Sequence, residues 1–205
     1  MSTPARRSGV LATRGRGAAA LVALSVAVGC AKASRDAGAR AGAPPAKPLA
    51  LVDLREACVP TGPERCWNAR DDNCNGIIDE GCGVSTGLVQ FMIAWDAPSA
   101  DVDLLVTDPK GELVEVRRKS SAGLVKDRDC PGRRKECRGN NFENVYLVGD
   151  EPKRGVYNVR VRLERLEGED VPISVTFGAR VGPKSYSTTL DLSRPEEERR
   201  LVFTL

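Results

Sequence analysis

Hydrophobic and polar positions alternate from residue 87 to residue 205, in short runs separated by turn-forming residues. Residues 156–164 show this most clearly, because Val159, Val161 and Leu163 share one side of an extended chain and polar residues share the other. The alternation predicts strands with one buried and one solvated face, and no window shows sustained helical periodicity. The eight predicted strands are 87–95, 102–107, 112–117, 145–148, 156–164, 173–180, 185–192 and 201–205.

These strands predict an all-β fold for residues 84–205. Eight strands over about 120 residues favour a two-sheet β-sandwich, jelly-roll-like in its connections. The chain is 41% apolar, which is enough for a packed core, and only 4% aromatic, so that core is expected to be mostly aliphatic.

An apolar run at residues 18–29 follows four arginines and ends at Cys30. A basic start, a short apolar stretch and small residues before the cysteine predict an export signal over residues 1–29. The run has 12 residues, whereas a helix that crosses a bilayer needs about 20. We therefore expect the chain to be exported rather than to span the membrane at this point.

The end of this run, Ala27-Val28-Gly29-Cys30, resembles the lipobox of bacterial lipoproteins, although Ala27 stands where Leu is usual. In that family the cysteine is acylated and becomes the first residue of the mature protein. The resemblance implies lipidation at Cys30 and a membrane anchor at the cell envelope, with the outer membrane of a Gram-negative bacterium as the expected location. The alternative is ordinary signal cleavage, in which Cys30 has no special role.

Residues 30–50 are predicted to form a tether without a fold. Ala, Gly and Pro fill 12 of the 19 positions from 31 to 49, with scattered basic residues and no apolar face. Such a stretch cannot bury enough surface to offset the loss of chain entropy. We expect it to hold the folded body away from the membrane.

Evenly spaced cysteines mark the next segment, residues 51–83. Cys58, Cys66, Cys74 and Cys82 are separated by seven residues each, with few bulky apolar side chains between them. An exported segment of this composition depends on disulfides for its stability, and four cysteines allow three pairings. A zinc site of four thiolates is the alternative, although the tight C-x2-C pairs of such sites are missing.

Oxygen-bearing side chains between these cysteines follow the pattern D-x-N-x-N-G-x-x-D, which matches the first nine positions of a calcium-binding loop. Gly76 stands at the sharp turn, and Cys82 stands at position 12, where a bidentate Glu is usual. Glu80 therefore replaces that Glu, or the loop binds weakly at extracellular calcium levels. The alternative is an Asx-rich turn without metal. The predicted ligands are Asp71, Asn73, Asn75, the Ile77 carbonyl, Asp79 and Glu80.

The run Cys66-Trp67-Asn68, followed by residues 71–82, resembles the metal-binding motif of MopE type, which is abundant in secreted proteins and lipoproteins of myxobacteria. Ala69 stands where that motif often has Gly. The family is sometimes described as copper-binding, but copper favours imidazole and thioether ligands. The chain has no His and, after the predicted signal, only Met92, so Ca²⁺ is the cofactor that we expect.

Two blocks of the C-terminal region resemble the YfaP-like and pre-peptidase C-terminal-like sandwich domains of bacteria. The first block joins Trp95 to an Asp-x-Asp-Leu stretch and an Asp-Pro-x-Gly turn, and the second joins residues 143–146 to residues 155–159. The resemblance implies a non-catalytic accessory or binding module.

Acidic side chains near the strand ends are candidates for a second oxygen site at one end of the sandwich. The alternative is that they are solvated acids on an outer face. These candidates are Asp96, Asp101, Asp103, Asp127, Asp129 and Glu143.

Cys130 and Cys137 bracket a short basic loop, and a local disulfide between them is expected in an oxidising compartment. Four basic residues gather there: Arg133, Arg134, Lys135 and Arg138. An exposed, solvated loop is the ordinary meaning of such a cluster. A contact surface for an anionic glycan or lipid is the alternative.

Charge and composition exclude several functions. The absence of His removes Ser-His-Asp and Cys-His catalysis together with His-ligated zinc. Without residues 1–29 the chain holds 27 basic and 28 acidic residues, so the basic surplus of a nucleic-acid-binding protein is missing.

Taken together, these features predict a lipid-anchored, calcium-binding protein of the cell envelope with a structural, adhesive or accessory binding role, and no enzyme. Its expected partners are the membrane and an envelope protein or glycan. A first alternative is a subunit of an envelope complex that docks a partner through the sandwich. A second, weaker alternative is a glycan hydrolase that uses paired carboxylates among the acids near the strand ends.

Overall fold

The computed structural model describes residues 58–131, 135–137 and 139–205, which all belong to one compact unit spanning residues 45–205. The predicted export signal, Cys30, the tether and residues 51–57 of the cysteine-rich segment lie outside the described residues. In the described part of the chain, no helix is long and apolar enough to span a membrane.

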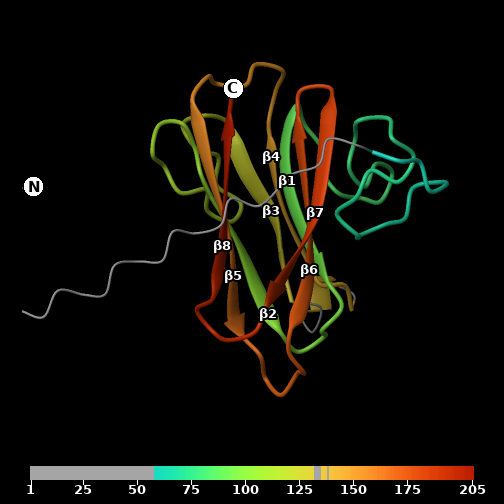
Figure 1. Cartoon of the computed structure of the whole chain (residues 1–205). Helices are drawn as coiled ribbons and strands as arrows, with labels where there is room; N and C mark the ends of the chain where they lie inside the picture. Colours follow the sequence, from blue (N-terminus) through green and yellow to red (C-terminus); the bar gives the residue numbers. More distant parts are fainter. Residues whose placement is uncertain (1–57, 132–134, 138) are drawn as a thin grey trace, which may run out of the picture. The chain divides into compact units, whose positions relative to one another are not determined.

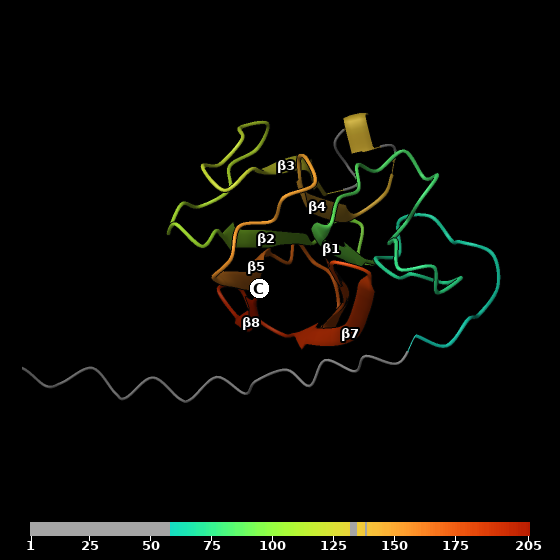
Figure 2. The same cartoon turned by 90° about the horizontal axis from the view of Figure 1, so that it is seen from above.

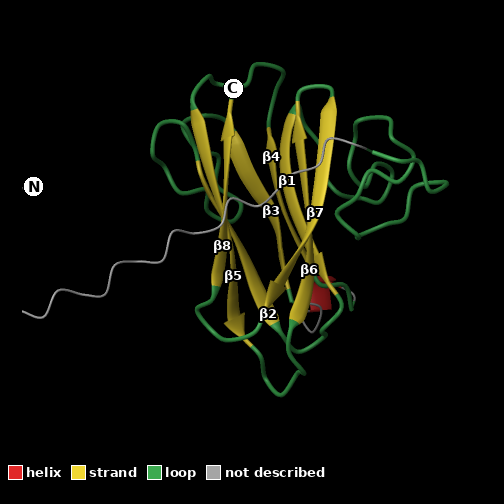
Figure 3. Cartoon of the chain, in the orientation of Figure 1, coloured by secondary structure: helices red, strands yellow, loops and turns green. Residues whose placement is uncertain are grey.

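Eight strands and one short 3-10 helix make up the regular structure of the described residues (Figures 1 and 3). The strands are β1 (Val89–Trp95), β2 (Asp101–Thr107), β3 (Leu124–Cys130), β4 (Phe142–Leu147), β5 (Val156–Arg165), β6 (Ile173–Val181), β7 (Lys184–Leu192) and β8 (Glu198–Thr204). The 3-10 helix η1 (Lys135–Cys137) lies between β3 and β4.

The strands form two sheets that face each other across the core, as the view from above in Figure 2 shows. The larger sheet has the order β3-β4-β1-β6-β7, the smaller has the order β2-β5-β8, and all paired strands are antiparallel. The all-β, two-sheet sandwich that the alternation predicted is confirmed.

Seven of the eight predicted strands coincide with observed ones, and the exception is the region between β2 and β4. Residues 112–117 form no strand and make only the isolated bridges Thr107–Leu113 and Val116–Lys126, so that prediction is wrong. The strand there is β3, whose sequence is largely charged and whose alternation is broken by a shift of register between Lys126 and Arg128. A bulge of this kind hides a strand from period-two patterning.

The core between the sheets is aliphatic with a small aromatic centre. Along β1, Val89, Phe91, Ile93 and Trp95 face the smaller sheet and belong to the main cluster of buried residues. Phe91 contacts both Tyr157 and Phe203, with ring centroids 6.2 and 5.0 Å apart. Other members of this cluster include Val102, Leu104, Val106, Leu124, Val145, Val159, Val161, Leu163, Val175, Phe177 and Leu201.

Part of the outer face of the larger sheet, along β1 and the start of β4, is also buried, because the cysteine-rich segment covers it. Met92 and Ala94 of β1 and Phe142 of β4 point outward and pack with Ala69 and Ile78 in a second, smaller cluster. Every residue of β1 is therefore buried, which explains its nearly continuous apolar sequence.

Gly178 of β6 permits the close approach of this segment. A Cβ at residue 178 would lie 2.2 Å from the main-chain oxygen of Ala69, a distance that no real side chain tolerates. Because Gly178 has no side chain, the main chain of the cysteine-rich segment can contact the sheet directly at this position.

The loop between β2 and β3 folds back around the carboxylate of Asp108, which is 2% exposed. This carboxylate accepts hydrogen bonds from the N–H groups of Lys110 at 2.8 Å, Glu112 at 3.0 Å and Ala122 at 3.0 Å. Burial alone would raise the pKa of Asp108, but these donors and the Ser120 hydroxyl hold the pKa below its ordinary value of 3.8. Asp108 is thus the reason why residues 112–117 turn back instead of extending as a strand.

We predict that Asp108→Asn lowers the free energy of unfolding at neutral pH by about 1–3 kcal/mol, because a buried set of N–H donors loses its charged acceptor. Since the pKa of Asp108 is lower in the folded than in the unfolded chain, this contribution is complete above the unfolded pKa and disappears as pH falls through the folded pKa. Urea unfolding of the wild type and of Asp108→Asn, from about pH 7 down to about pH 3, measures this contribution to stability. Asp150→Asn, at an exposed loop residue, is the control. If the difference in free energy of unfolding between Asp108→Asn and the wild type stays constant over this pH range, the role assigned to the Asp108 carboxylate is contradicted.

Candidate metal centre

Two interleaved disulfides frame the segment that carries the predicted calcium loop. Cys58 pairs with Cys74 and Cys66 pairs with Cys82, with Cα atoms 5.6 and 5.2 Å apart. The first cysteine thus pairs with the third and the second with the fourth, which selects one of the three possible pairings and rules out a zinc site of four thiolates. Each bridge closes a loop of 16 residues, for which a stabilisation of about 3 kcal/mol is typical.

The carboxylate of Asp71 is the centre of a tight turn. Its Oδ1 accepts a hydrogen bond from the Asn75 N–H at 3.0 Å, and its Oδ2 accepts one from the Gly76 N–H at 2.8 Å. The Ser185 hydroxyl of β7 donates to Oδ2 as well, at 2.6 Å, so that Asp71 also ties the turn to the sandwich.

Glycine is required at residue 76, as the calcium-loop pattern predicts. Gly76 has a φ of 86°, in the left-handed region, and a Cβ there would lie 2.6 Å from the Pro183 main-chain oxygen. The turn is therefore fixed by both its own main-chain conformation and its contact with the turn between β6 and β7.

Two carboxamides and one carboxylate converge on the other side of this turn. The side-chain N–H groups of Asn73 and Asn75 both donate to Oε1 of Glu80, at 2.5 Å each. Oε2 of Glu80 is buried and has no hydrogen-bond partner among the residues that the structure describes. A buried carboxylate oxygen without a donor is costly, and a cation beside it would satisfy it.

Oxygens of the same residues retain capacity for a cation. From the described residues, Oδ1 of Asn73 accepts one hydrogen bond, from the Asn75 N–H at 3.0 Å, and Oδ1 of Asn75 accepts one, from the Ile77 N–H at 2.9 Å. A carboxamide oxygen has two lone pairs, so each of these atoms keeps one for an ion. Four of the predicted side-chain ligands, at positions 71, 73, 75 and 80, thus lie within one turn.

Asp79, the remaining predicted side-chain ligand, has different hydrogen-bond partners. It is fully buried, and its carboxylate accepts hydrogen bonds from the main-chain N–H groups of Ala69 at 3.1 Å and Asn68 at 3.4 Å. Burial raises the pKa of Asp79 to about 7, against the lowering effect of those N–H donors and with a further rise from the negative charge of Glu64. In this arrangement Asp79 holds the chain that precedes the turn.

Residues held by Asp79 adopt strained main-chain conformations. Trp67 and Ala69 have φ values of 63° and 58°, in the left-handed region that favours glycine. Ala69 is also fully buried, against Gly178. The glycine that the MopE-type motif often has at this position would adopt this conformation without strain.

Glu64 was not singled out by the sequence pattern, yet it supports the whole loop. Its Oε1 accepts the Asp79 N–H at 2.8 Å and its Oε2 accepts the Asp72 N–H at 3.1 Å. Burial raises the pKa of Glu64 above its ordinary value. Neither Glu64 nor Ser185 stands at a motif position, and only the folded chain shows that they contact the turn.

Three of the six candidates for a second site lie together. Asp103, Asp129 and Glu143 each offer a carboxylate oxygen within 4.8 Å of the others. Lys126 points into this cluster, with its Nζ 2.7 Å from both Asp129 Oδ1 and Glu143 Oε2. Burial alone would lower the pKa of Lys126, but these two carboxylates raise it above its ordinary value. The ammonium group thus provides the positive charge that a metal ion would bring.

The other three candidates lie elsewhere. Asp101 forms an ion pair with Arg165, Asp127 accepts a hydrogen bond from the Asn144 carboxamide at 2.8 Å, and Asp96 is exposed. Asp103 itself pairs with Arg162 at 3.0 Å. The geometry therefore favours ion pairs rather than a second oxygen site for most of this set.

The predicted disulfide between Cys130 and Cys137 is present, with Cα atoms 5.5 Å apart. It closes a loop at the end of β3, and Lys135 within that loop is exposed. The remaining residues of the predicted basic cluster, Arg133, Arg134 and Arg138, lie outside the described residues.

We predict that Lys126→Met lowers the free energy of unfolding at neutral pH by about 3–5 kcal/mol. Glu143 is 1% exposed, and burial already raises its pKa well above the ordinary value, so without Lys126 its carboxyl group must either stay charged and unpaired or take up a proton on folding. Chemical denaturation measures the change. Lys119→Met removes an exposed lysine from the loop before β3 and is expected to change stability by less than about 0.5 kcal/mol. Equal effects of the two substitutions would show that the buried ion pairs of Lys126 contribute no more to stability than an exposed lysine does.

Comparison of the chain with known protein families, with curated proteins and with solved structures gives no match in any of the three. What the site can bind therefore follows from its own residues.

Proposed function

We propose that this chain is a non-catalytic, calcium-binding module that a lipid anchor at Cys30 displays on the cell envelope. Glu80 carries the calcium part of the proposal, because its buried Oε2 has no partner in the described part of the chain and its other oxygen is held by the carboxamides of Asn73 and Asn75. Asp71 and Glu80 supply two negative charges, and every candidate ligand atom is an oxygen, as Ca²⁺ prefers.

Residues 71, 73, 75 and 80 would hold the ion, together with the Ile77 carbonyl. A bound Ca²⁺ supplies a positive charge that neutralises the two carboxylates and cross-links the turn. Asp79 has a positioning role, because its carboxylate fixes residues 68 and 69. With Cys82 at the last loop position in place of a bidentate Glu, weak binding suited to extracellular calcium is expected, with a Kd of about 10⁻⁴–10⁻³ M.

A non-catalytic role is supported by the state of the acidic residues. Asp101 and Asp103 are ion-paired with Arg165 and Arg162, and Glu143 is buried against Lys126. A glycosidase needs two carboxyl groups free to exchange protons on either side of a bound sugar. These carboxylates are instead committed to ion pairs between strands.

We predict that calcium at about ten times its Kd raises the melting temperature of the full-length oxidised chain by a few degrees, equivalent to about 1.4 kcal/mol. Glu80→Gln keeps the size of the side chain but removes its charge, and is expected to abolish most of this shift. Glu151→Gln, at an exposed loop residue, is the matched control and should leave the shift intact. A wild-type melting temperature that does not change in millimolar calcium, or a Glu80→Gln variant that responds as the wild type does, contradicts the calcium assignment.

We predict that Cys30→Ser moves the protein from the membrane fraction to the soluble fraction of the cell envelope, because the acylated cysteine is the proposed anchor. Cell fractionation followed by detection of the chain measures the distribution. Substitution of Ser25 by Ala within the same apolar run leaves the cysteine in place and is the control. Membrane retention of Cys30→Ser equal to that of the control rules out lipidation as the anchor.

A further inference from the structure

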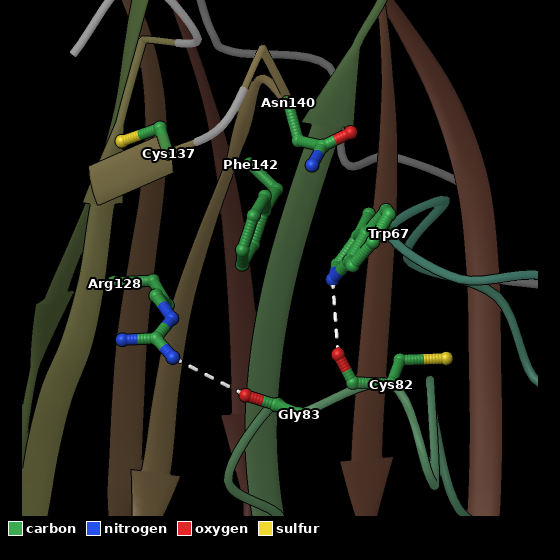
Figure 4. Close-up of a pocket in the computed structure, with 7 residues that line it drawn as sticks. All are labelled: Trp67, Cys82, Gly83, Arg128, Cys137, Asn140 and Phe142. Atoms are coloured by element: carbon green, nitrogen blue, oxygen red, sulfur yellow. Dashed lines mark hydrogen bonds between the residues drawn. The ribbon is translucent and has the colours of Figure 1, made fainter. Parts of the chain in front are cut away.

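A hollow of about 190 Å³ opens between the cysteine-rich segment and the end of the larger sheet (Figure 4). The segment contributes Trp67, Cys82 and Gly83 to its walls, and the sheet side contributes Arg128 and Phe142, with Asn140 just before β4. Neither the segment nor the sandwich forms this hollow alone, and none of its residues is a proposed calcium ligand.

Two stacked aromatic rings form part of the wall of the hollow. The ring centroids of Trp67 and Phe142 are 6.5 Å apart and their planes differ by 23°. Figure 4 shows both rings nearly edge-on, with their faces turned toward one another. Phe142 is 4% exposed, whereas Trp67 is 39% exposed and offers part of its ring to a ligand.

Trp67 is held in place before any ligand arrives. Its indole N–H donates to the Cys82 carbonyl at 3.1 Å, and the disulfide between Cys66 and Cys82 fixes the adjoining main chain. With the N–H already satisfied, the exposed part of the ring offers a ligand only apolar surface. A fixed aromatic face loses little entropy on binding.

Arg128 brings an unneutralised positive charge to the same hollow. Its guanidinium donates to two main-chain carbonyls of the described residues, those of Gly83 at 3.2 Å and Asp127 at 3.5 Å. Within the described part of the chain, Arg128 forms no ion pair with a carboxylate, in contrast to Arg162, Arg165 and Arg199. The guanidinium thus keeps N–H donors for an anionic group of a ligand.

Asn140 adds a neutral polar group at the rim. Figure 4 shows its carboxamide at the end of the gap between the two rings. Among the described residues this carboxamide has no hydrogen-bond partner, and only the main-chain N–H of Asn140 is bonded, to the Cys137 carbonyl at 3.0 Å. One side chain therefore offers both a donor and an acceptor toward the hollow.

An aromatic face, a carboxamide and an unpaired guanidinium together match one class of ligand. A sugar ring presents C–H groups on its flat face, which pack on the electron-rich face of an indole, and hydroxyl groups at its edge, which suit a carboxamide. A guanidinium selects a sugar that carries a carboxylate. We propose that this hollow binds an acidic saccharide, with one uronic acid unit against Trp67 and its carboxylate on Arg128.

This inference deepens the proposed function, since it gives the binding module a ligand class. It does not depend on calcium, because the hollow and the 71–80 loop share no residue. Titrations are therefore made with a calcium chelator present, which also prevents calcium from bridging the saccharide to the protein. Failure of the calcium proposal and failure of this one are then observed separately.

The test titrates the full-length chain with the trisaccharide of galacturonic acid and, in parallel, with the trisaccharide of galactose. Calorimetry gives the affinity, and tryptophan fluorescence reports on Trp67, since Trp95 is 4% exposed and hydrogen-bonded inside the sandwich. We expect the acidic trisaccharide to change the fluorescence and to bind at least about tenfold more tightly than the neutral one.

Arg128→Gln is expected to remove this tenfold preference while it leaves the weaker binding of the neutral trisaccharide unchanged. Because Arg128 is exposed, the substitution is compatible with folding; Arg154→Gln, at an exposed residue outside the hollow, is the matched control. Trp67→Ala should weaken the binding of both trisaccharides. Absence of binding by both trisaccharides at millimolar concentration, equal affinities for the two, or a preference that survives Arg128→Gln overturns the proposal. So does tighter binding of a short peptide with a free carboxyl terminus, which would assign the hollow to peptides.

Discussion

The outer face of the five-stranded sheet imposes the constraint on which the rest of the structure depends. Met92, Ala94 and Phe142 would lie in water if nothing covered them, and the burial of such side chains is worth about 1.5–3 kcal/mol for each large one. The cysteine-rich segment covers them with Ala69 and Ile78, although it has too few apolar residues for a core of its own. Segment and sheet therefore complete one another: the sheet supplies the apolar surface and the disulfides supply the rigidity.

Much of the fold was predictable because period-two alternation reports directly on burial. The alternation located seven strands, including β5, where one face is buried and the other is wet. It failed at β3, where Lys126 occupies an inward position and a bulge shifts the register. Charge that is buried in an ion pair looks like surface charge in a sequence, so only its partners in the folded chain reveal it.

The candidate site was predictable to the extent that it is local. Asp71, Asn73, Asn75 and Gly76 lie in one turn, and their spacing was enough to place them together. The contacts that anchor this turn come from outside the motif, from Glu64 and from Ser185, which is 114 residues from Asp71 in the chain. The hollow at Trp67 combines side chains from four separate stretches of sequence, and no spacing rule relates them.

The order of the disulfides has a topological consequence. Because Cys58–Cys74 and Cys66–Cys82 overlap along the chain, every peptide bond between residues 58 and 82 is spanned by at least one covalent bridge. A single cut by a protease anywhere in this stretch would leave the two fragments joined. The sandwich would then stay attached to everything that precedes residue 58. To release it within this stretch, a protease would have to make three cuts, one in each of the intervals 58–66, 66–74 and 74–82, unless a reductant first opened the disulfides.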